Sequence, residues 1–241
     1  MARQLRRVRI AADDPADTAA IYGLITGTTA IPDATGVTVP IENAELRISA
    51  TGPTRGRGVF GIDVTVDDLA GRVAALSDMG VTTEEFDDHV HVTLAGLDVS
   101  LSEEPPATAI SSTAHLDHVA IAVHDVVDDV APWEAATGVA AHQMGLHPIS
   151  NGAFSAARIE LEDRMLELLS PTPGVDSPMA ARVAANGPGP MALAMPVSDV
   201  DACKAELEGR GVRVLWNDPH WMVHPADAGG VLVQLTPRVQ H

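Results

Sequence analysis

The chain has 241 residues, 46% hydrophobic and only 3% aromatic, so a core built mainly from Ala, Val, Leu and Ile is expected. The formal net charge of −18 argues against a nucleic-acid partner and against an anionic membrane surface, because both attract Lys and Arg. No apolar run approaches the roughly 20 residues of a membrane span, and the short basic start does not resemble a signal peptide, so a cytoplasmic location is expected.

Strand and helix patterns alternate along the first half. Leu5–Ala12 alternates apolar and polar residues, and Asp14-Pro15 then provides an N-cap and a first helical residue for a helix that stops at Gly27. Further along, we expect a loop around 31–33, strands over 45–50 and 59–66, a helix over 67–79, and strands over 89–94 and 97–101.

Residues 102–108 contain two adjacent prolines and break both periodicities, which is typical of a linker. We therefore predict a first domain over 1–104, a linker over 105–113 and a second domain over 114–241. In the second half we expect strands near 118–123, 153–161, 164–169, 191–197, 212–215, 221–224 and 231–235, and helices near 126–137, 177–187 and 199–209.

The same order of elements recurs along the chain. Arg7 and Gly61 occupy matching strands, and so do Leu46 and Ser100, with the same spacing in both pairs. Each repeat has one strand, one helix and about three further strands, so four such modules in two pairs account for the whole chain. One module cannot bury its sheet alone, so the modules must pair.

A paired βαβββ module resembles the vicinal-oxygen-chelate superfamily, and the second half is most similar to its methylmalonyl-CoA epimerase branch. The stretches that carry the resemblance are Asp117–Val123, Glu167–Pro171, Asp176–Pro178, His224-Pro225 and Gly229–Leu235. The resemblance implies an α+β glyoxalase-like fold of two domains, each a pair of modules that forms a cupped mixed sheet.

The resemblance also implies a divalent metal ion (Zn, Co, Mn, Fe or Ni) held by one residue from each of four strands. His118 and Glu167 fall on the first two ligand positions. Ala192 falls on the third, where the family carries His, and Gln234 on the fourth, where it usually carries Glu. The implied metal ligands are therefore His118, Glu167 and Gln234, in a weakened site, and a metal-free site is the alternative.

Two of these residues are candidates for catalysis. His118 alternates with branched residues on its strand, and Glu167 lies at an inward strand position where a buried carboxylate without a partner would be costly. An ordinary hydrogen-bonded core histidine is an equal alternative for His118. The expected substrate-binding residues are Ala192, Gln234, His224 and Trp221.

Other histidines allow weaker interpretations. A ligand cavity is expected in the second domain. His142 and His147 lie in a segment that could reach it, and His220 flanks Trp221 either at the mouth of this cavity or in a surface loop. His89 and His91 alternate on one strand face beside Asp87 and Asp88, where they could bind metal, although a solvated strand face is favoured.

The first half lacks an inward His/Glu/Asp set. Its positions that match the family ligands fall on Arg7, Leu46, Gly61 and Ser100, so neither metal binding nor catalysis is expected there. Arg7 and Arg9 are expected to be solvated or paired with acidic neighbours. The single cysteine, Cys203, is expected to be a buried, inert thiol.

We expect an enzyme of lyase, isomerase or oxygenase type that acts on a small organic molecule, as a monomer or homodimer. Two-base epimerisation is disfavoured because Gln234 cannot be a base, and extradiol dioxygenation and glyoxalase chemistry each lose ligands at Ala192 and Gln234. One alternative is a metal-free binding protein of the bleomycin-resistance type. A degenerate structural or regulatory relative is the other.

Overall fold

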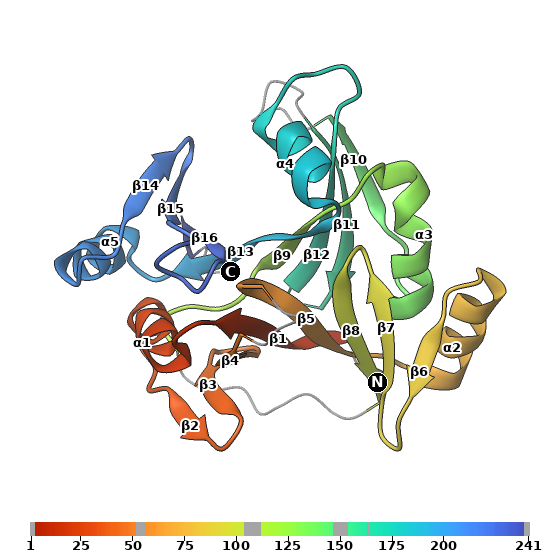
Figure 1. Ribbon diagram of the computed structural model, residues 1–241, viewed down its shortest axis with the longest axis horizontal. Coiled ribbons are helices and arrows are strands. Elements are labelled where there is room, and N and C mark those ends of the chain that lie inside the picture. Colours follow the sequence, from red (N-terminus) through yellow and green to blue (C-terminus); the bar gives the residue numbers. More distant parts are fainter. Residues whose placement is uncertain (1–2, 52–55, 104–111, 147–153, 163, 239–241) are drawn as a thin grey trace. The chain divides into compact units, whose positions relative to one another are not determined.

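A computed structural model describes residues 3–51, 56–103, 112–146, 154–162 and 164–238. Most of the expected linker and His147 lie outside the described residues. The structure contains two eight-stranded mixed sheets, one formed by each half of the chain (Figure 1). This confirms the expected α+β fold of paired βαβββ modules.

The first sheet has the strand order β2-β3-β4-β1-β5-β8-β7-β6. Its first module comprises β1 (Gln4–Ala12), α1 (Pro15–Thr26), β2 (Ile31–Asp33), β3 (Gly36–Pro40) and β4 (Glu45–Ala50). Its second module comprises β5 (Gly58–Thr65), α2 (Leu69–Asp78), β6 (Thr83–Glu85), β7 (Val90–Leu94) and β8 (Leu97–Ser102).

The second sheet repeats this plan in the order β10-β11-β12-β9-β13-β16-β15-β14. Its first module comprises β9 (His118–Ala122), α3 (Val126–Thr137), β10 (His142–Leu146), β11 (Phe154–Leu161) and β12 (Arg164–Pro171), followed by α4 (Pro178–Asn186). Its second module comprises β13 (Gly189–Val197), α5 (Val200–Gly209), β14 (Val214–Asn217), β15 (His220–Val223) and β16 (Leu232–Pro237).

Several short strands were not predicted from the sequence. The expected loop around 31–33 is strand β2, which forms an antiparallel hairpin with β3. All three β2 residues are exposed, so no apolar alternation marks the strand. Pro32 is tolerated because β2 lies at the sheet edge, where a missing backbone donor costs little. Strands β3, β6 and β10 were missed as well.

Capping side chains set the helix starts. The carboxylate of Asp14 accepts hydrogen bonds from the backbone N–H groups of Ala16 and Asp17, at 3.0 and 2.9 Å. The side chains of Asp125, Ser177 and Asp199 accept equivalent bonds at the starts of α3, α4 and α5. Each satisfies a backbone donor that the helix cannot pair internally.

Helices cover one face of each module. In the first module, α1 packs against β3 and β4, and its Tyr22 is fully buried together with Val8 and Ile10 of β1. Within the described residues, no helix is both long enough and apolar enough to cross a bilayer.

The chain also divides into two compact units, and each unit combines segments from both halves. Unit 1 comprises residues 1–5, 62–106 and 119–191, and unit 2 comprises 6–61, 107–118 and 192–241. In unit 1, α2 packs against α3, and Arg3 donates to the carbonyl of Gly138 at 2.7 Å. In unit 2, α1 packs against α5. The sequence-based domain limits stay a prediction.

Candidate functional site

His118 is held by its neighbour in the sequence. In unit 2, Nδ1 of His118 lies 2.7 Å from Oδ2 of Asp117, and the His118 side chain is 14% exposed. The backbone N–H of Asp117 donates to the carbonyl of Ala194 on β13 at 3.0 Å, which ties this segment to the sheet. An Nδ1–H that donates to a carboxylate leaves Nε2 as the proton-accepting nitrogen. The arrangement therefore suits an acid–base group.

Ala192 and Gln234 lie on the same face of the sheet in unit 2. Ala192 pairs with Leu232 and Ala194 pairs with Gln234, while Gln234 also pairs with Met222 of β15. The intervening residues Leu193, Val233 and Leu235 point to the opposite face and are at most 1% exposed. The Ala192 face therefore carries the small side chains of Ala192 and Ala194, the Gln234 amide and the apolar side chains of Leu232 and Met222.

Trp221 lies on the other face of β15 from Met222. Nζ of Lys204, on α5, is 4.8 Å from the centre of the Trp221 ring, and Trp216 meets that ring edge-on at 5.0 Å. His224 closes a turn, since its Nδ1 accepts a hydrogen bond from the backbone N–H of Ala226 at 3.1 Å. The structure thus separates Trp221 from the face that carries Gln234.

A second histidine in unit 2 is electrostatically coupled to His118. Burial lowers the pKa of His220, the charge of His118 lowers this pKa further, and Asp218 opposes both effects. The neutral form of His220 is therefore favoured.

Glu167 belongs to a row of polar residues in unit 1. It lies opposite Arg158 on β11, and Arg158 lies opposite His142 on β10, so the three side chains share one face. Glu167 is only 8% exposed, and its Oε1 accepts hydrogen bonds from Nε and Nη2 of Arg158, each at 3.2 Å. Arg158 thus provides the cation that compensates this buried carboxylate.

The donor set at the ligand positions that the resemblance implies is incomplete. Ala192 has no donor atom, and an oxygen of Glu167 is engaged by a guanidinium. Among the residues that the structure describes, no group of three or more His, Cys, Asp or Glu side chains is arranged to hold an ion. His118 and Gln234 belong to unit 2 and Glu167 to unit 1. Their convergence on one ion stays a prediction.

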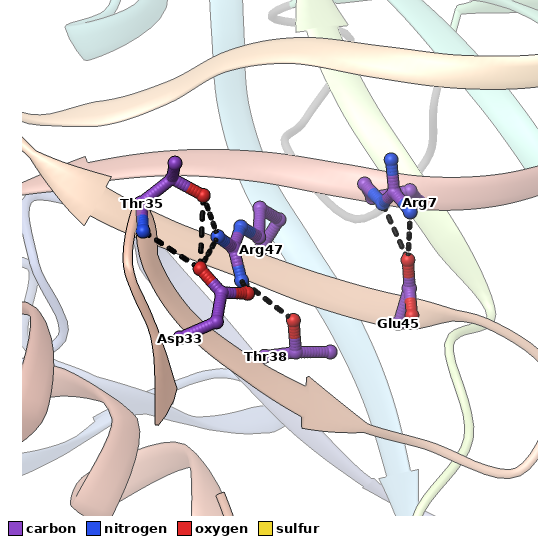
Figure 2. A network of polar contacts seen from close by, with 6 residues as sticks. All are labelled: Arg7, Asp33, Thr35, Thr38, Glu45 and Arg47. Atoms are coloured by element: carbon purple, nitrogen blue, oxygen red, sulfur yellow. Dashed lines mark hydrogen bonds and ion pairs between the residues drawn. The ribbon is translucent and has the colours of Figure 1, made fainter. Parts of the chain in front are cut away.

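A polar network on the first sheet was not foreseen (Figure 2). Arg47 on β4 binds both carboxylate oxygens of Asp33 at 2.6 Å and donates to Thr38 at 2.9 Å. This contact, together with bonds from Thr35, lowers the pKa of Asp33. The network joins β2, β3 and β4, and no motif marks it because its members meet only through strand register.

Arg7 is paired with Glu45 in the same view, which agrees with the expectation of an acidic neighbour. The match of Leu46 to a family ligand position is wrong, because Leu46 is fully buried and pairs with Val8. Glu45, one residue earlier, is the residue that lies beside Arg7. A shift of one residue along a strand moves a side chain to the opposite face.

Comparisons with known proteins agree with this architecture. The family described as "Glyoxalase-like domain" matches residues 116–232. Mitochondrial methylmalonyl-CoA epimerase from Bos taurus is 30% identical over 145 residues, which cover 56% of this chain and 81% of that protein. The protein of the same name from Homo sapiens is 29% identical over 136 residues, which cover 53% of this chain and 76% of that protein.

The fold of the whole chain is similar to that of a solved structure. A mutant of 4-hydroxymandelate synthase from Streptomyces coelicolor aligns with a TM-score of 0.71 over 100% of this chain and 95% of that chain. The sequence identity is 13%, so this similarity shows the fold alone.

Proposed function

We propose that the chain, which belongs to the vicinal-oxygen-chelate superfamily, is an enzyme that removes and returns a proton on a small organic molecule. His118 is the acid–base group of this reaction. The observation that carries the proposal is the 2.7 Å contact between His118 Nδ1 and Asp117 Oδ2. A carboxylate at Nδ1 fixes the orientation of the ring and stabilises the imidazolium that forms when Nε2 accepts a proton.

The similarity to methylmalonyl-CoA epimerases supports an isomerase-type reaction at a carbon beside a carbonyl group. In such a step, His118 takes the proton from the carbon, and the electron pair moves to the carbonyl oxygen to give an enolate. A proton that solvent returns to the opposite face of this carbon inverts its configuration, whereas a proton that His118 returns to the same face gives exchange without inversion. One base is sufficient for this exchange, so the lack of a basic group at Gln234 is not an obstacle.

The composition of the Ala192 face supports a small ligand. Ala192 and Ala194 have small side chains, and the Gln234 amide can donate or accept one hydrogen bond beside them. A mostly apolar surface with few polar groups suits a compact organic substrate. A coenzyme-A ester is less well supported, because its phosphates favour a basic rim and this chain has a net charge of −18.

The proposed reaction does not depend on a tightly bound metal ion. The metal site implied by the family is weakened here by Ala192, by Gln234 and by the Arg158–Glu167 ion pair. A guanidinium beside the carboxylate offsets part of the negative charge that would attract a divalent cation. We therefore assign the proton transfer to side chains alone.

Hydrogen–deuterium exchange tests the assignment because it detects proton abstraction whatever the final product is. Acyl thioesters, including methylmalonyl-CoA, and small keto acids are incubated with the protein in D2O, and NMR follows loss of the proton beside the carbonyl. H118N is expected to slow exchange about 10²–10⁴-fold, and D117N is expected to slow it by a smaller factor. H124N is the matched control, because His124 is exposed just beyond the same strand.

A ligand-binding protein is the second candidate, and the Arg158–Glu167 pair favours it because a neutralised carboxylate is a poor base. The two candidates differ in one outcome. If compounds from the panel bind tightly while their protons never exchange, with divalent metal supplied, the enzyme proposal fails and the binding role stands. If exchange occurs but H118N matches H124N, the assignment of His118 fails.

A further inference from the structure

Two imidazole rings and a phenyl ring meet at the start of β7. His89 and His91 are two residues apart, so their side chains point to the same face. Their ring centres are 4.8 Å apart with an interplanar angle of 52°. Phe86 stacks on His89 at 4.8 Å and 6°, and its backbone N–H donates to the carbonyl of His89 at 2.9 Å. The hairpin between β6 and β7 thus fixes this cluster within unit 1.

We propose that His89 and His91 together bind one divalent transition-metal ion, Cu²⁺ most tightly, at a site separate from the one that the family resemblance implies. Imidazole nitrogen is a preferred ligand of Cu²⁺, Ni²⁺ and Zn²⁺, and Cu²⁺ has the highest affinity of the three. This revises the expectation that the first half binds no metal, which considered only inward-facing strand positions.

The separation of the rings fits a shared ion. A metal ion lies about 2.0–2.1 Å from a coordinating imidazole nitrogen, so two imidazoles bound to one ion at a tetrahedral angle have ring centres roughly 5 Å apart. The observed 4.8 Å between the ring centres matches this separation. Both histidines are partly exposed, so an ion reaches them from solvent.

Asp88 orients one of the two rings. Its Oδ1 lies 2.5 Å from Nδ1 of His89, and this contact leaves Nε2 of His89 as the nitrogen that can coordinate an ion. Metal-binding histidines usually donate their second ring N–H to a carboxylate, which fixes the tautomer and raises the basicity of the ligand nitrogen. Asp88 therefore acts as a positioning residue.

The surroundings of His91 provide space and negative charge. His91 lines a cavity of about 610 Å³ together with Glu84, Thr93 and Asp98, and it lies opposite Glu84 in the strand register. These carboxylates attract cations. Among the described residues, no group of three or more His, Cys, Asp or Glu side chains is arranged to hold an ion, so water or a small ligand would complete the coordination of the two imidazoles.

Copper titration of the untagged full-length chain tests the site. Calorimetry is expected to show one tight Cu²⁺ per chain, and electron paramagnetic resonance is expected to show hyperfine coupling to two imidazole nitrogens. H89N and H91N should each weaken binding at least tenfold and leave one coupled nitrogen. D88N should weaken binding by roughly 10–100-fold, as is typical when the hydrogen-bond partner of a metal ligand is lost.

H124N serves as the control, since it removes one exposed histidine outside the cluster and should leave the tight site unchanged. Circular dichroism confirms that each variant is folded, and H89Q and H91Q replace any variant that is not. The proposal is overturned if folded H89N and H91N variants bind Cu²⁺ as tightly as the unmodified chain. It is also overturned if the tight ion couples to fewer than two imidazoles before any substitution.

Discussion

Arg158 and Glu167 lie directly opposite each other on β11 and β12, and two guanidinium nitrogens donate to one carboxylate oxygen at 3.2 Å. Glu167 is 8% exposed, whereas a third of the Arg158 side chain reaches solvent. The pair therefore couples a buried anion to a cation at the surface of the sheet.

R158Q should destabilise the chain by about 1–3 kcal/mol at neutral pH, because Glu167 loses two charge-assisted bonds while it stays buried. The free energy of unfolding is measured by urea denaturation. The double variant R158Q/E167Q should be more stable than R158Q, since it removes the buried charge as well. A cost below about 0.5 kcal/mol for R158Q, the level typical of surface substitutions, would show that the pair does not compensate Glu167.

H118N should raise the pKa of His220. The positive charge of His118 disfavours protonation of His220, so its removal makes protonation easier, although burial still holds the pKa below its ordinary value. D218N should lower the same pKa, because Asp218 favours the charged form. NMR titration of the His220 ring protons gives both values. An unchanged His220 in H118N would contradict the coupling.

Asp227 should contribute to stability in mildly acidic solution. Arg213 donates to both of its carboxylate oxygens at 2.8 Å and lowers the pKa of Asp227 to about 2. A lowered pKa in the folded chain gives stability that is present above the ordinary value of 3.8 and is lost as the pH falls from 3.8 toward 2.

D227N should therefore lower stability at pH 7 and flatten its loss between pH 4 and 2. Thermal unfolding followed across this range measures the slope. D201N on α5 is the control, because no ion pair is seen for this exposed side chain within the described residues. The same slope in D227N and the unmodified chain would show that Asp227 is not the group responsible.

A192H should raise the affinity for zinc or cobalt if Ala192 occupies the third ligand position of the family. The side chain enters the face that carries Gln234, where a histidine adds the missing donor. The comparison is made in an H91N background, so that the proposed copper site does not contribute. No gain in affinity in calorimetry would count against the alignment of Ala192 with that position.

A fragment of residues 113–241 should be poorly folded when expressed alone. In unit 2, Asn43 from the first half exchanges two hydrogen bonds of 3.0 Å with the backbone of Leu116 in the second half, and α1 packs against α5. Removal of the first half exposes these surfaces. Co-expression with residues 1–104 should restore solubility, and a soluble, ligand-competent fragment alone would show that the first half is dispensable.

Periodicity and capping signals were sufficient for the repeated order of elements. The alternation in Leu5–Ala12 and the N-caps at Asp14, Asp125 and Asp199 depend on neighbours within a few residues, so the sequence carries them directly. Short edge strands such as β2 were not found, because hydrogen bonds to a neighbouring strand stabilise them and no buried face marks them.

The sequence by itself determined the paired βαβββ modules, the family and the candidate positions His118, Glu167, Ala192 and Gln234, because local patterns and short characteristic stretches encode them. Only the tertiary structure decided the partners of these residues. Arg158 meets Glu167 through the register of two strands, and Trp221 turns away from Gln234 because successive strand residues face opposite sides. Charged residues that are far apart in the sequence become neighbours only when backbone hydrogen bonds align their strands. Composition and spacing therefore could not predict these pairs.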